Sequence, residues 1–126
     1  MNIPENLKYS EEHEWARDES GIIVVGITDY AQGELGDIVF IDLPEAGGTV
    51  TQNESFGTIE AVKAASDIFS PVSGEIIEVN NALSDKPEII NKDPYGNGWM
   101  IKIKPSDISE LDTLMNADAY KNLIAE

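Results

Sequence analysis

Residues 57–71 read GTIEAVKAASDIFSP, and this run holds a single lysine between two strand-like arms. Residues 54–61 and 64–70 have the composition of strands, and the second arm ends in a Ser-Pro pair, which is a stop signal. Only Val62 and Lys63 remain between the arms. The sequence therefore predicts a two-residue hairpin whose tip side chains point into solvent. Because neither tip residue is Gly or Asn, type I geometry is favoured over type I′.

A weak internal repeat surrounds this hairpin. The motif Gly36-Asp37-Ile38-Val39 recurs 38 residues later as Gly74-Glu75-Ile76-Ile77, and Phe56-Gly57-Thr58-Ile59 has a looser echo at Gly98-Trp99-Met100-Ile101. Two similar β halves that meet near residue 63 predict a mainly β fold. We expect a flattened barrel or sandwich with quasi-twofold symmetry, a barrel-sandwich hybrid, with the lysine at a hairpin tip.

The rest of the chain is expected to form one domain over residues 1–126, with a β core at about 7–104. Asp37 to Leu43 is expected to be a central strand with Ile38, Phe40 and Asp42 on one face. Thr28 is expected to cap a short helical turn that ends near Gly33. Ser109 and Asp112 approximate a capping box, and a C-terminal α-helix is expected over about 106–125, with one helical stripe of apolar residues: Ile108, Leu111, Met115, Ala119 and Leu123.

Composition excludes several classes of function. There are 24 acidic and eight basic residues, and a net charge of −16 argues against nucleic-acid binding. The charge serves either solubility or steering toward basic partner surfaces. No cysteine is present, and His13 is the only histidine, so neither a metal site nor a catalytic triad is expected. We expect no membrane span and no signal segment, hence a cytoplasmic protein.

An isolated lysine at a hairpin tip suits a carrier domain, in which the amine is acylated and anchors a swinging arm. Small neighbours at Ala61, Ala64 and Ala65 leave the tip open, and Glu60 offers a charge that a modifying enzyme can read. Two alternatives stay open. Lys63 is an ordinary solvated turn lysine of an unmodified β adaptor, or it forms a Schiff base, although such lysines are usually desolvated.

Motifs along nearly the whole chain resemble those of the glycine cleavage H-protein family, which is related to lipoyl and biotinyl carrier domains. They are Tyr9-Ser10, His13-Glu14-Trp15, Gly26 to Gln32, Leu35 to Phe40, Leu43-Pro44, Glu60 to Ala64, Ser70 to Gly74, Asn91, Pro94-Tyr95 and Gly98 to Met100. Ala61 is the one departure, since the family usually has serine there. A biotin carrier would place methionines beside the lysine, and the lipoyl domain of a 2-oxo acid dehydrogenase would place Asp before it.

The resemblance implies a non-catalytic carrier with lipoate attached covalently to Lys63. It implies transfer of the aminomethyl group of glycine from glycine decarboxylase (P protein) to aminomethyltransferase (T protein), with electrons passing to dihydrolipoyl dehydrogenase (L protein). A lipoate-attaching enzyme is a further partner, and a monomer is expected. A related alternative is an H-like protein that donates lipoyl groups to other complexes.

The resemblance also implies roles for four more residues. Glu60 and Gly74 match positions that lipoyl carriers use for recognition by the attaching ligase, and Gly74 is equally explained as a turn glycine before a strand. Glu14 and Asp67 match positions near a cleft that shelters the loaded arm, where a carboxylate can pair with an ammonium group. The alternative for both is an ordinary solvated acid.

Overall fold

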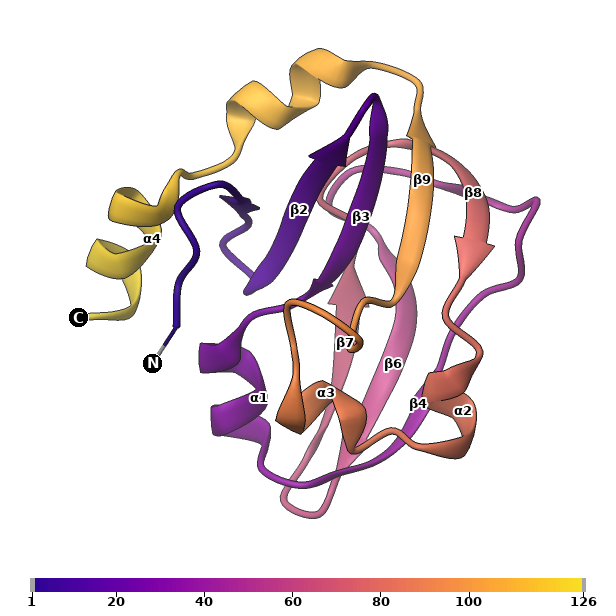
Figure 1. The fold of residues 1–126 in the computed structure, drawn as a ribbon, viewed down its shortest axis with the longest axis vertical. Helices are drawn as coiled ribbons and strands as arrows, with labels where there is room; N and C mark the ends of the chain where they lie inside the picture. The colour runs from indigo at the N-terminus through magenta and orange to yellow at the C-terminus, as the bar shows by residue number, and fades with distance from the viewer. Residues whose placement is uncertain (1, 126) are drawn as a thin grey trace.

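The structure, a computed structural model, describes residues 2–125 and consists mainly of β-strands (Figure 1). All strand pairs are antiparallel, in a six-stranded sheet of order β1-β2-β3-β9-β8-β5 and a three-stranded sheet of order β4-β6-β7. The strands are β1 (Lys8–Tyr9), β2 (Glu14–Glu19), β3 (Ile22–Ile27), β4 (Ile38–Asp42), β5 (Thr49–Val50), β6 (Ser55–Ala61), β7 (Ala65–Phe69), β8 (Gly74–Val79) and β9 (Ile101–Pro105). The helical segments are α1 (Asp29–Leu35), α2 (Ala82–Asp85), α3 (Ile89–Lys92), the 3-10 helix η1 (Ile108–Thr113) and α4 (Ala117–Ile124).

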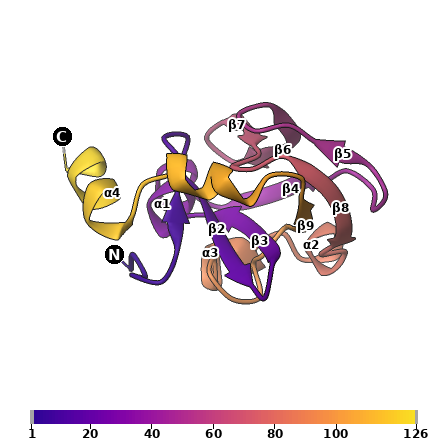
Figure 2. The same ribbon diagram turned by 90° about the horizontal axis from the view of Figure 1, so that it is seen from above.

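The two sheets form separate layers with the main core between them (Figure 2). Outside the bulges, alternate residues of the strands point inward, so the core is rich in β-branched side chains from both sheets: Ile41, Ile59 and Ile68 from the small sheet, and Ile23, Val25, Ile76 and Ile103 from the large one. On β3 the intervening Val24 is also fully buried, in a second cluster beneath α4. The predicted mainly β sandwich is therefore confirmed, as an open sandwich and not a closed barrel.

The predicted quasi-twofold repeat is visible in the strand irregularities. β4 has a register shift between Ile38 and Phe40 where it pairs with β6. β8 has one between Ile76 and Glu78 where it pairs with β9, again 38 residues later. A bulge places an extra residue on one strand and bends it. The sequence repeat thus corresponds to a repeated bulged strand pair.

The expectation of a central strand at residues 37–43 is wrong in two respects. β4 is an edge strand, because the small sheet has the order β4-β6-β7. The bulge also interrupts the alternation, so that Ile38 and Ile41 are both buried while Val39 and Phe40 are both exposed. A period of two no longer holds once one extra residue is inserted.

The single C-terminal helix expected over residues 106–125 is also wrong. Asp107, not Ser109, caps η1 by accepting a hydrogen bond from the Ser109 amide, and η1 ends at Thr113. Met115 then pairs as a strand with Tyr9, and their backbones exchange two hydrogen bonds of 2.8 Å. This pairing uses the amide and the carbonyl that a continuous helix would need. α4 starts afterwards with Asn116 as its cap.

For α1 the sequence predicted the start of the helix correctly but not its end. Thr28 caps α1 as predicted, because its side chain accepts a hydrogen bond from the Ala31 amide. The helix continues past Gly33 to Leu35, and it ends where Gly36 adopts a φ of 78°. No helix within residues 2–125 has the length and apolar character needed to cross a membrane.

Candidate functional site

Lys63 lies at the tip of the β6–β7 hairpin, which forms one end of the molecule (Figure 1). Below the tip, the Ala61 amide donates a 2.8 Å hydrogen bond to the Ala64 carbonyl. The side chains of Val62 and Lys63 are exposed beyond this bond. The hairpin inferred from the sequence is therefore confirmed, and the lysine amine is accessible to a partner.

A second segment supports the tip from one side. The Val62 amide donates a 3.0 Å hydrogen bond to the Asp37 carbonyl. The stem of Lys63 passes over Gly36, where a Cβ atom would be in van der Waals contact with Lys63 Cε at 3.4 Å. A glycine here permits the left-handed backbone at the end of α1.

Asn91 fixes this supporting segment, a role that the sequence analysis did not assign. Its Nδ2 donates to the Gly36 carbonyl at 2.8 Å and to Gln32 Oε1 at 3.0 Å, and its Oδ1 accepts from the Ile38 amide at 3.0 Å. The Asn91 side chain on α3 thus makes the hydrogen bonds that a neighbouring strand would otherwise make with the backbone beside the hairpin. No periodic pattern in the sequence signals such a bond.

The exposed face of the small sheet carries two of the acids singled out from the sequence. Glu60 lies opposite Phe40 on one side and Ala65 on the other. Asp67 lies opposite Thr58 on the next outward-facing row. Residues directly opposite each other share a face, so Glu60 and Asp67 flank the lysine hairpin on the same exposed surface.

Glu14 occupies a different environment, at the edge of β7. It is 2% exposed; its Oε1 accepts a 2.6 Å hydrogen bond from Ser10 Oγ, and its Oε2 accepts one of 3.2 Å from the Phe69 amide. Burial raises the pKa of the Glu14 carboxyl to about 7, although both hydrogen bonds favour the ionised form. Glu14 is therefore not an ordinary solvated acid, and within residues 2–125 no hydrogen bond joins it to Asp67.

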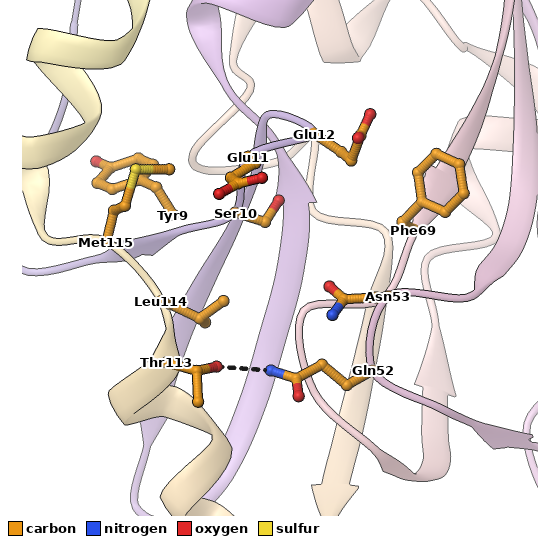
Figure 3. A pocket seen from close by; sticks show the side chains of 10 residues that line it. All are labelled: Tyr9, Ser10, Glu11, Glu12, Gln52, Asn53, Phe69, Thr113, Leu114 and Met115. Atoms are coloured by element: carbon orange, nitrogen blue, oxygen red, sulfur yellow. Dashed lines mark hydrogen bonds between the residues drawn. The ribbon is translucent and has the colours of Figure 1, made fainter.

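A cavity of about 520 Å³ is lined by Ser10 and Phe69, the two residues that donate hydrogen bonds to the Glu14 carboxylate (Figure 3). The loop after β1, the turn before β6, the end of β7 and the C-terminal segment form its walls, through Tyr9, Ser10, Glu11, Glu12, Gln52, Asn53, Phe69, Thr113, Leu114 and Met115. Gln52 Nε2 closes one side with a 2.9 Å hydrogen bond to Thr113 Oγ1. Neither Glu14 nor Asp67 is part of this lining. The sequence analysis did not predict that the C-terminal segment lines the cavity, because this depends on the interruption between η1 and α4.

Gly74 lies far from the lysine. It follows the end of β7 that is remote from the hairpin tip, and Figure 1 shows the start of β8 toward the opposite end of the molecule from that tip. A Cβ atom at Gly74 would collide with the Lys104 carbonyl oxygen and approach Ile103 Cγ2 to 2.7 Å. Close packing against β9 is thus sufficient to explain a glycine at this position.

Comparison with known proteins identifies the family. The family model described as Glycine cleavage H-protein matches residues 7–126. A glycine cleavage system H protein from Bacteroides thetaiotaomicron is 58% identical over 124 residues, 98% of each chain. The chain belongs to the glycine cleavage H-protein family.

Further relatives agree with this assignment. A glycine cleavage system H protein from Geobacillus kaustophilus is 53% identical over 126 residues, covering 100% of this chain and 99% of its own. The crystal structure of such a protein from Mycobacterium marinum superposes with a TM-score of 0.91 at 40% identity, covering 98% of this chain and 100% of that one. As a member of the H-protein family, the chain is a carrier component and not a catalytic enzyme.

Proposed function

We propose that Lys63 is the attachment site for lipoate in this H-protein family member. The supporting observation is an exposed amine at a hairpin tip that is hydrogen-bonded to the Asp37 carbonyl, with the lysine stem over Gly36 and small alanine side chains at positions 61, 64 and 65. Attachment forms an amide between the lysine Nζ and an activated lipoyl carboxyl group. The amine loses a proton and the activating group leaves. When bound, the lipoyl group supplies a disulfide that accepts an aminomethyl group and electrons.

The partners in this proposal are glycine decarboxylase, aminomethyltransferase and dihydrolipoyl dehydrogenase, together with a lipoate-attaching enzyme. The protein itself anchors, orients and shelters the arm. Tethering to a fixed hairpin raises the effective concentration of the arm at each docked partner. Glu60, on the exposed face beside the hairpin, supports recognition by the attaching enzyme. For Gly74 such recognition stays a prediction.

Asp67 and Glu14 have different roles in this proposal. Asp67 is exposed and lies four residues along from Lys63, about 13 Å at the usual strand rise, which supports a role for its carboxylate in pairing with an ammonium group on the arm. Glu14 already accepts hydrogen bonds from Ser10 and Phe69, and it joins the edge of β7 to the large sheet. Its contribution is to hold the wall of the cleft in position.

The direct test combines mass spectrometry with reconstitution. Intact protein from native cells is expected to carry a lipoyl adduct on Lys63, and Lys63→Arg is expected to abolish glycine decarboxylation in a mixture of the four purified components. Lys86→Arg, at another exposed lysine, is the matched control. An unmodified native protein, or full activity of Lys63→Arg, would overturn the proposal.

A further inference from the structure

The exposed apolar side chains of this protein are concentrated near the lysine hairpin. Residues 2–125 expose five large hydrophobic side chains, and four of them belong to the hairpin tip, β4 and β8: Val39, Phe40, Val62 and Ile77. Single exposed apolar residues are normal on a soluble protein, whereas a group of them marks an interaction surface.

The two quasi-equivalent bulges create this surface. The β4 bulge turns Val39 and Phe40 outward, and the β8 bulge turns Ile77 outward. Phe40, Ile77 and Val79 line one groove of about 670 Å³ between β4, β8 and α2. Phe40 is 51% exposed and Ile77 is 43% exposed, so folding leaves much of both side chains without apolar contact.

The groove has an acidic rim. Asp42, Glu45 and Glu78 line it, and no lysine or arginine does. Glu78 forms an ion pair of 3.6 Å with Lys102. In residues 2–125 no ion pair involves Asp42 or Glu45. An apolar floor with carboxylates around it is complementary to a partner surface that presents an apolar side chain among basic ones.

The groove borders the strand that leads into the lysine hairpin. Phe40 lies directly opposite Glu60, which precedes Lys63 by three residues. The segment that leads into β4 is bonded to the tip itself, through the Val62 amide and the Asp37 carbonyl. A protein seated in the groove therefore lies beside the base of the hairpin.

We propose that this groove is the docking surface for the enzyme that acylates Lys63, with Phe40 and Ile77 as apolar anchors and Asp42 and Glu45 facing basic residues of that enzyme. The inference rests on the proposed function. The attaching enzyme must bring its reaction centre to the lysine Nζ itself and must cover the hairpin base. Enzymes that act on the distal end of a long arm have no such requirement.

The test measures acylation kinetics with a purified lipoate–protein ligase supplied with lipoate and ATP, followed by intact mass. Phe40→Ser and Ile77→Ser are each expected to lower kcat/KM roughly ten-fold. Ile108→Ser is the matched control, because Ile108 is 47% exposed but lies on η1, away from the groove. Far-UV circular dichroism and urea unfolding establish that the variants are folded.

Two charge-reversal variants distinguish local contacts in the groove from long-range electrostatic steering. Glu45→Lys and Asp112→Lys change the net charge equally, and both residues are exposed, but only Glu45 lines the groove. Glu45→Lys is expected to slow acylation several-fold more than Asp112→Lys.

The outcomes are distinguishable. If wild-type protein is acylated at Lys63 and the groove variants react as fast as their controls, the docking surface is refuted while the carrier function stands. If acylation is unchanged but aminomethyl transfer slows, the groove serves another partner and the proposed occupant is wrong. If wild-type protein is never acylated, the proposed function itself fails.

Discussion

Replacing Glu14 by Gln is expected to change how the stability of this protein depends on pH. The Glu14 carboxyl is buried between Ser10 and the Phe69 amide, and burial raises its pKa from 4.5 to about 7. The folded state therefore binds this proton more tightly than the unfolded state does. The stabilisation of the folded state by this bound proton is fully present below pH 4.5, and it is lost as the pH rises through 7.

The size of the effect follows from the two pKa values. At about 1.4 kcal/mol per pKa unit, the interval from 4.5 to about 7 corresponds to roughly 3 kcal/mol of unfolding free energy. Glutamine has nearly the same shape as the protonated acid and does not titrate. Its amide can accept from Phe69 and donate to Ser10, so the local geometry is kept.

The assay is urea unfolding of both proteins between pH 4.5 and 8. Relative to wild type, Glu14→Gln should gain up to roughly 3 kcal/mol over this range. Other titrating groups are common to both proteins and cancel in the difference. Glu88→Gln, at an exposed glutamate, controls for the loss of one negative charge. A stability difference between Glu14→Gln and wild type that does not vary with pH would refute the argument.

Two further substitutions test the packing that supports the site. Asn91→Ala leaves the Ile38 amide without its side-chain acceptor and is expected to cost roughly 2 kcal/mol in urea unfolding; a loss below about 0.5 kcal/mol would show that water replaces the bond. Gly74→Ala drives its Cβ onto the Lys104 carbonyl oxygen and is also expected to cost roughly 2 kcal/mol. Gly33→Ala is its control, since a Cβ there meets no atom within 4 Å, and equal stability of the two alanine variants would contradict the clash.

The features predicted correctly from the sequence are those that depend on near neighbours. The hairpin follows from two strand-like arms with only Val62 and Lys63 between them. The capping role of Thr28 follows from a side chain that bonds an amide three residues away. The repeat of Gly36 and Gly74 correctly predicted two similar β halves, because each glycine lies two residues before the equivalent isoleucine at which a bulge begins, Ile38 in β4 and Ile76 in β8.

The features that were missed depend on distant segments. The C-terminal helix breaks because Met115 pairs with Tyr9, and nothing between residues 106 and 125 indicates that partner. The alternation of inward and outward side chains expected for β4 is interrupted by a bulge, and the bulge arises where β4 pairs with β6. Asn91 supports the lysine hairpin through bonds to residues more than fifty positions away in the sequence.

The sequence alone determined that a lysine lies on an exposed two-residue tip, the group that we propose as the attachment site, because turn formation and solvent exposure at such a tip depend on a few adjacent residues. Only the tertiary structure decided that Glu14 is buried with a raised pKa while Asp67 stays in solvent, and that Phe40 and Ile77 share a groove. Desolvation and surface shape depend on contacts between side chains that are far apart in the sequence, and patterns along the sequence do not specify those contacts.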